Sequence, residues 1–141
     1  MKKILVPIDG SKDSTNAMLK AKELATTFGS EITVLNVIPR MTEYKYVHNK
    51  DLYKDVERNI LKESKLLLEN AMKYFEGFTG KVDSVYKRGD PVDEIVKYAE
   101  DGKYDLVVMG NRGLGAFSRT LLGSVSNKVI HHVNTSVLIV K

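Results

Sequence analysis

The residues best suited to chemistry are glycines and serines in the last third of the chain. They are Gly110, Gly113, Gly115 and the run Gly123-Ser124-Val125-Ser126. Glycine permits positive φ and close backbone approach to a ligand, and the free N–H groups at a helix start bind anions. Arg112 adds a possible charge-assisted contact. The spacing therefore predicts a phosphate cradle, although glycine at a strand end and serine at a helix start are also common for structural reasons alone.

A second candidate is Asp9, which ends the apolar run Ile4-Leu5-Val6-Pro7-Ile8. A carboxylate here suits hydrogen bonds from a ribose or nucleobase, or a metal–phosphate complex. The alternative is an aspartate that caps its own turn at Asp9-Gly10. A receiver-type phosphoacceptor is disfavoured, because the third strand is followed by Lys87-Arg88-Gly89 rather than by an acidic residue.

Several other chemistries are excluded by residue type or spacing. The chain has no cysteine, so disulfides, zinc–thiolate sites and cysteine nucleophiles are ruled out. No P-loop pattern occurs, and the loop after the first strand lacks the dinucleotide fingerprint. His131 and His132 are adjacent, so they lie about 100° apart on a helix and do not match the metal-binding i, i+4 geometry. We interpret them as cations at a helix C-terminus.

The elements that must position these residues alternate between strand and helix. Continuous apolar runs predict strands over 4–8, 32–38, 106–109 and 137–140, and a weak apolar–polar alternation predicts a shorter third strand over 82–86. Helical spacing predicts helices over 17–28, 52–75, 92–99 and 125–133. Asp13 or Ser14 is the expected cap of the first helix, and Asp90 that of the third. Residues 40–50 read as an irregular polar segment.

This alternation indicates one α/β domain over residues 1–141, with a parallel sheet and right-handed crossovers. Ligands of such sheets bind at the carboxyl ends of the strands, where the strand order reverses. If Asp9 and the Gly110–Gly123 loop serve one ligand, strands 1 and 4 are neighbours. The expected fold is therefore an open five-stranded sheet of order 3-2-1-4-5, with helices on both faces.

Composition narrows the setting. The 141 residues carry a net charge of +4 and are 43% hydrophobic. Lysine and glutamate interleave, so nucleic acid is not an expected partner. No apolar run reaches the roughly 20 residues of a membrane span, and the start does not match a secretory signal. We expect a cytoplasmic protein that binds neither membrane nor nucleic acid.

The spaced motif Gly110-x2-Gly113-x9-Gly123-Ser124 resembles the ATP-binding signature of universal stress proteins, G-2x-G-9x-G-[ST]. The opening Ile4–Ser11 and the ending Leu122–Ile130 with Ser136–Val140 are similar to the same family, so the resemblance covers the whole chain. It implies a Rossmann-like, adenine nucleotide alpha hydrolase-like fold. It also implies ATP as ligand, with Mg²⁺ or Mn²⁺ on the phosphates rather than in a protein metal site.

The resemblance also implies roles for particular residues. Pro7 and Asp9 border the adenosine, and Val37 contacts adenine. The loop from Met109 to Gly113 approaches the ribose and phosphates, and the start of the last helix holds the triphosphate. The implied binding residues are Pro7, Asp9, Val37, Met109, Gly110, Asn111, Arg112, Gly113, Gly123, Ser124, Val125 and Ser126.

These features together favour an ATP-binding regulatory module that switches with bound nucleotide and acts on a protein partner. No general base, arginine finger or P-loop lysine is apparent, so slow ATP hydrolysis at most is expected. Two alternatives stay open: an adenine-nucleotide alpha hydrolase-type enzyme, because Gly10-Ser11-Lys12-Asp13-Ser14 faintly resembles a pyrophosphate loop, or a nucleotide-free dimeric scaffold. Residues 137–140 form an apolar edge strand that predicts a homodimer.

Overall fold

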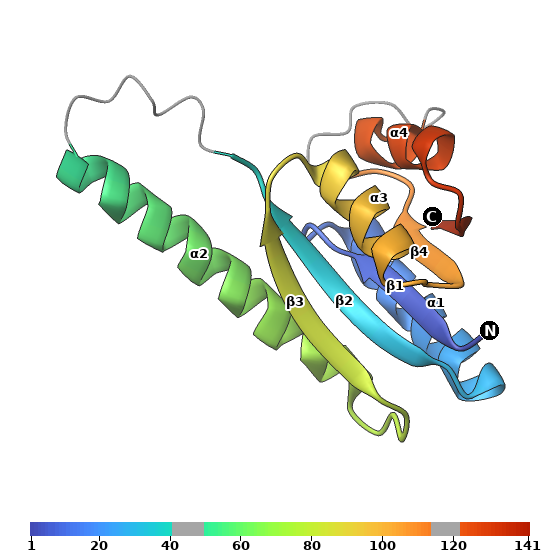
Figure 1. Cartoon of the computed structure of the whole chain (residues 1–141). Helices are drawn as coiled ribbons and strands as arrows, with labels where there is room; N and C mark the ends of the chain where they lie inside the picture. Colours follow the sequence, from blue (N-terminus) through green and yellow to red (C-terminus); the bar gives the residue numbers. More distant parts are fainter. Residues whose placement is uncertain (41–49, 114–121) are drawn as a thin grey trace.

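The computed structural model describes residues 1–40, 50–113 and 122–141. Five parallel strands form one sheet in the order β3-β2-β1-β4-β5, and helices cover both of its faces (Figure 1). The strands are β1 (Lys3–Pro7), β2 (Glu31–Ile38), β3 (Val82–Arg88), β4 (Leu106–Gly110) and β5 (Ser136–Val140). The helices are α1 (Lys12–Phe28), α2 (Lys50–Met72), the 3₁₀ helix η2 (Lys73–Phe75), α3 (Pro91–Asp101) and α4 (Ser124–His132).

The strand order confirms the predicted fold class. β1 pairs in parallel with both β2 and β4, so the chain leaves the first strand in one direction and later returns to its other side. The reversal of strand order therefore lies between β1 and β4. In sheets of this type the carboxyl ends of the strands at that point form a natural crevice.

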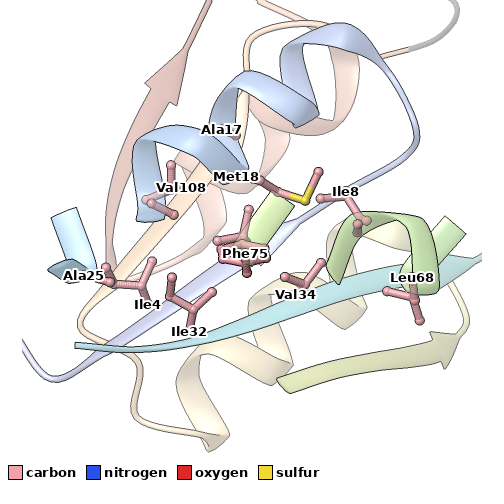
Figure 2. Close-up of a cluster of buried hydrophobic side chains, with 13 residues drawn as sticks. Ile4, Ile8, Ala17, Met18, Ala25, Ile32, Val34, Leu68, Phe75 and Val108 are labelled. Carbon is pink, nitrogen blue, oxygen red and sulfur yellow. The ribbon is translucent and has the colours of Figure 1, made fainter. Parts of the chain in front are cut away.

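Each face of the sheet buries its own hydrophobic core, because successive side chains of a strand point to opposite faces. On one face, Ile4 of β1 packs with Met18 of α1, Leu68 of α2 and Phe75 of η2 (Figure 2). On the other face, Leu5 of β1 packs with residues of α3 and α4, among them Ile95 and Val129. The two cores fix all four helices around the sheet.

The helix boundaries show why each helix begins where it does. Ser11 caps α1, and its Oγ accepts a hydrogen bond from Ser14 N. The expectation of Asp13 or Ser14 as the cap was wrong, because the helix starts one turn earlier than the apolar stripe. Asp90 caps α3 as predicted, accepting from Asp93 N. Gly29, in the left-handed conformation with φ 67°, ends α1 as predicted.

The long helix α2 departs from the predicted stripe at its N-terminal end. Ser64, Leu68 and Ala71 are buried, but Leu52 is 51% exposed. Figure 1 shows the reason: the first turns of α2 extend beyond the sheet, so they have no strand beneath them. Most of the polar segment predicted over 40–50 lies outside the described residues. Among the described helices, none has both the length and the apolar character that a membrane crossing requires.

Candidate functional site

A cavity of about 740 Å³ lies over the carboxyl ends of β1, β2 and β4. Its walls come from segments far apart in the sequence: the ends of three strands, the α2 helix, and the starts of α1, α3 and α4. Eleven of the twelve predicted binding residues line it. They are Pro7, Asp9, Val37, Met109, Gly110, Arg112, Gly113, Gly123, Ser124, Val125 and Ser126.

The twelfth residue, Asn111, is buried and is not part of the cavity lining. Its backbone N–H donates to Val140 O at 2.8 Å, and its carbonyl accepts from Gly123 N at 2.7 Å. The same carbonyl accepts from Ser126 Oγ at 2.9 Å. Asn111 therefore joins the two ends of the glycine loop and fixes the start of α4 from behind the cavity wall.

Three helix N-termini meet at this cavity, and they differ in how their N–H groups are satisfied. The first turns of α1 and α3 are capped by the side chains of Ser11 and Asp90. The N-cap residue of α4 is Gly123, which has no side chain and therefore makes no side-chain cap. Since uncapped helix N–H groups and the helix dipole attract anions, α4 is the helix best prepared for a phosphate.

The motif glycines are required by close contacts. The expectation of positive φ is wrong for Gly110 and Gly113, because the positive-φ glycines of the described chain lie elsewhere. A Cβ at Gly110 would lie 2.7 Å from the Asp13 carbonyl carbon, and one at Gly123 would lie 2.9 Å from Asn111 O. The contact at Gly113 is with Asp9 Oδ2 at 2.6 Å. Gly115 falls outside the described residues.

Asp9 serves its own turn with one oxygen, since Asp9 Oδ1 accepts from Ser11 N at 2.9 Å. The turn needs Gly10, whose φ is +88°. The other carboxylate oxygen lies beside Gly113 at the cavity, and the residue is exposed. The predicted turn cap is therefore present, and it leaves the second oxygen facing the region where a ligand would lie.

Arg112 brings positive charge to the same end of the cavity. Its backbone N–H donates to Asp13 Oδ2 at 3.1 Å, which ties the loop after β4 to the first turn of α1. Its side chain is half-buried and lines the cavity. The region of the cavity near Arg112 and the start of α4 thus combines backbone N–H groups, the Ser124 hydroxyl and a guanidinium.

The rest of the cavity wall is mostly apolar and was only partly predicted. Leu35, Val37, Met109 and Ile95 line it from the face of the sheet that carries α3 and α4, and Ile60 and Leu67 line it from α2. The α2 residues were not predicted, because the distance between α2 and the strand ends is set by tertiary packing. The available signal was the apolar spacing of Leu52, Val56 and Ile60, which continues past the part of α2 that the sheet covers.

Two polar residues of the cavity wall were not predicted as site residues. Ser64 Oγ on α2 donates to Asn36 Oδ1 at 2.7 Å, and Asn36 Nδ2 on β2 donates to Ile8 O at 2.9 Å. Both side chains are buried and both residues line the cavity. The signal in the sequence was a lone asparagine inside the apolar run 32–38.

The histidines occupy the helix end to which we assigned them. His131 Nδ1 and His132 Nδ1 lie 2.6 and 2.7 Å from the carbonyls of Asn127 and Lys128, one turn back in α4. Both are exposed and neither lines the cavity. Across residues 1–40, 50–113 and 122–141, no group of three or more histidine, aspartate or glutamate side chains is placed to hold a metal ion.

Comparison with known proteins agrees with this architecture. The Universal stress protein MJ0531 of Methanocaldococcus jannaschii is 32% identical over 140 residues, covering 99% of this chain and 82% of the relative. The solved structure of MJ0577, from the same organism, has a TM-score of 0.86 at 36% identity, covering 99% of this chain and 95% of that one. A universal stress protein solved in complex with cAMP has a TM-score of 0.75 at 27% identity, covering 99% and 97%.

The match to the family is as extensive as the match to individual relatives. The model of the Universal stress protein family matches residues 1–141, the full length of the sequence. The motif Gly110-x2-Gly113-x9-Gly123-Ser124 lies in the corresponding structural context, between the fourth strand and the last helix. The chain belongs to the universal stress protein family.

Proposed function

We propose that this protein is a regulatory module that binds an adenine nucleotide, with ATP as its principal ligand. The observation that carries the proposal is the uncapped start of α4 at Gly123, which opens onto the cavity next to Arg112 and Gly113. Backbone N–H groups at such a helix start bind phosphate without needing a lysine. Ser124, which is exposed, lines the same part of the cavity, whereas Ser126 Oγ is buried and already donates to Asn111 O.

The cavity wall suits the two parts of a nucleotide. The apolar wall around Leu35, Val37 and Met109 fits the faces of a base, and the polar region at Arg112 and the start of α4 fits phosphates. A volume of about 740 Å³ lies within the usual range for small-molecule sites. A relative of 27% identity was solved in complex with cAMP, which supports an adenine nucleotide as the ligand class.

A divalent cation fits this site as a companion of the phosphates. Mg²⁺ is usually bound through one or two carboxylates together with substrate phosphates. At the phosphate end of the cavity, Asp9 is the lining carboxylate, and one of its oxygens lies beside Gly113. When bound, the ion would neutralise phosphate charge. The chain's own contribution is then Asp9, the α4 N–H groups and Arg112.

A binding role is favoured over an enzymatic one. In the hydrolase-type alternative, the loop Gly10–Ser14 would hold pyrophosphate, but Ser11 Oγ is engaged in capping α1. Within the described residues, no side chain at the phosphate end is placed as a general base supported by a second group. We therefore propose slow hydrolysis at most, with nucleotide binding altering the affinity for a protein partner in the cytoplasm.

The proposal is tested by calorimetry with ATP and Mg²⁺ on the wild type and on Gly123→Val. The valine side chain would clash with Asn111 O and cover the α4 start, so we expect ATP binding to fall by at least about 100-fold. Gly77→Ala is the control: it strains the backbone, since Gly77 has φ +78°, but Gly77 does not line the cavity, so stability should fall without a loss of ATP binding. Wild-type protein that binds no ATP below millimolar concentration contradicts the proposal and favours a nucleotide-free scaffold.

A further inference from the structure

The cavity at the strand ends extends onto both faces of the sheet. Val37 and Met109 line it and belong to the core under α3 and α4. Ile8 lines it as well but belongs to the core under α1 and α2, and Asn36 points to that same face because it follows Val34 by two residues in β2. The part on this second face, termed the α2 compartment, is bounded by Ile8, Asn36 and four residues of α2: Ile60, Glu63, Ser64 and Leu67.

The four α2 residues form one face of the helix. Their positions follow the spacing i, i+3, i+4, i+7, which places the side chains along a single stripe. Ile60 and Leu67 make the two ends of the stripe apolar, and Glu63 with Ser64 makes its middle polar. Within residues 1–40, 50–113 and 122–141, no lysine or arginine forms an ion pair with Glu63. The stripe therefore brings a negative charge to the wall of the α2 compartment.

The hydrogen bonds of Ser64 make it an acceptor toward this compartment. Ile8 O is a backbone carbonyl that can only accept, so the Asn36 group 2.9 Å from it is the Nδ2 donor. Asn36 Oδ1 then accepts from Ser64 Oγ at 2.7 Å, which uses the single hydroxyl proton of Ser64. Ser64 is 5% exposed, and the remaining lone pairs of its oxygen can only accept a hydrogen bond from a ligand.

We propose that the α2 compartment is a second binding site and that it takes a small organic amine in its ammonium form. The ammonium group donates to Ser64 Oγ and lies against the Glu63 carboxylate, and the apolar body of the ligand covers Ile60 and Leu67. An ammonium group has three donors and no acceptor, so it matches a wall whose polar groups accept. An anionic ligand would meet the charge of Glu63 instead.

The two parts of the cavity thus carry opposite charge. Arg112 and the uncapped start of α4 favour an anion on one face of the sheet. Glu63 and Ser64 favour a cationic donor on the other face. The cavity can therefore hold an anion and an amine at the same time. The amine site uses none of the residues assigned to the nucleotide, so it does not rest on the proposed function.

The test uses three probes of similar shape: 3-methylbutan-1-amine, 3-methylbutan-1-ol and 4-methylpentanoate. Each is titrated into the full-length, 15N-labelled protein, and amide chemical shifts give the affinity and the location. The amine should bind roughly tenfold more tightly than the alcohol, because its charge strengthens the hydrogen bond to Ser64 and adds an ion pair with Glu63. The largest shifts should lie at residues 60–67 and at Asn36.

Two substitutions at Glu63, which is exposed, test the role of its charge. Glu63→Gln keeps the shape and removes the charge, so it should lower the amine-to-alcohol ratio by about three- to fivefold. Glu63→Lys should reverse the order, so that 4-methylpentanoate binds more tightly than the amine. Glu69→Gln is the matched control, since Glu69 is an exposed glutamate of α2 that does not line the cavity. It should leave all three affinities unchanged.

Three outcomes would overturn the amine site. They are an amine that binds no more tightly than the alcohol, shifts centred on the start of α4 instead of α2, and an amine-to-alcohol ratio that Glu63→Gln leaves unchanged in a folded protein. The nucleotide proposal is judged separately by calorimetry with ATP. A protein that binds the amine at α2 and no ATP would contradict the proposed function alone.

Discussion

Gly110 and Gly123 belong to one sequence motif, yet they meet different surroundings. Gly110 faces backbone and Cβ atoms of Asp13, at 2.7 to 2.8 Å from an added Cβ. Gly123 faces the carbonyl of Asn111 at the entrance to α4. The first glycine therefore permits α1 to pack against the end of β4, and the last permits the ligand-facing helix start to form.

At Gly110 we predict that Gly110→Ala destabilises the fold by about 1–3 kcal/mol, the usual cost of overpacking. The added methyl group meets main-chain atoms of α1, which cannot rotate away as a side chain can. Urea unfolding followed by circular dichroism measures the loss. Gly113→Ala provides the contrast, since its Cβ meets a movable carboxylate oxygen of Asp9. Equal stability losses in the two variants would contradict this account.

At the scale of elements, β5 forms one edge of the sheet and pairs with β4 in the described part of the chain. Val140 O accepts from Asn111 N, so the polar groups of Val140 face β4. Because backbone groups alternate in direction along a strand, the N–H of Ile139 points to the outer edge. The side chains of residues 137–140 are half-buried. We propose that this edge pairs with a second copy of the chain.

We predict that Ile139→Pro shifts the protein from dimer to monomer in sedimentation experiments, because proline removes an outward N–H. Leu138→Pro is the comparison: its N–H faces β4, so that variant should lose stability as well. A wild type that sediments as a monomer, or an Ile139→Pro variant that stays dimeric, would count against pairing through β5.

The elements were predictable where one local signal set them. Apolar runs located four strands, a weak alternation located β3, and Asp90 with Pro91 marked the start of α3. Prediction failed where a second contact decided the outcome. Ser11 caps α1 because the helix starts at the turn made by Asp9 and Gly10, and Leu52 is exposed because α2 outruns the sheet.

At the scale of the whole molecule, a carboxylate at the end of the strands opposite the cavity links the chain start to the beginning of β4. Asp105 Oδ2 accepts from the backbone N–H groups of Lys2 and Lys3 at 2.8 and 2.9 Å. These two hydrogen bonds lower the pKa of the Asp105 carboxyl below its ordinary value. The carboxylate holds the chain start beside the beginning of β4, about a hundred residues away in sequence.

A lowered pKa in the folded state means that this stabilisation is complete above the unfolded pKa of about 3.9. It is lost as the pH falls through the lower, folded pKa. We predict that Asp105→Asn is less stable than the wild type at pH 7 and that the difference shrinks toward pH 2. Urea midpoints across pH 2 to 7 measure it. A difference independent of pH would show that the charge of Asp105 contributes nothing.

Which parts of the site could be predicted depends on whether their signals are local in the sequence. The glycine motif and Asp9 are local signals, and the strand order places them together at the cavity. The pair Asn36 and Ser64 is separated by 28 residues, and neither residue has a spacing that indicates the other. Asn111 was assigned to the ligand because it lies within the motif, but its backbone serves the connection between β4, β5 and α4.

The contact between Gly110 and Asp13 also affects how function is transferred between members of this family. A homologue that has ceased to bind nucleotide must still pack its first helix against its fourth strand, so selection for folding alone preserves the first motif glycine. A Cβ at Gly123 would likewise meet main-chain atoms, Asn111 O at 2.9 Å and Arg112 Cα at 3.1 Å, so packing alone also favours glycine at that position. Both glycines are therefore markers of architecture, and a homologue that keeps them is not identified as a nucleotide binder by them alone.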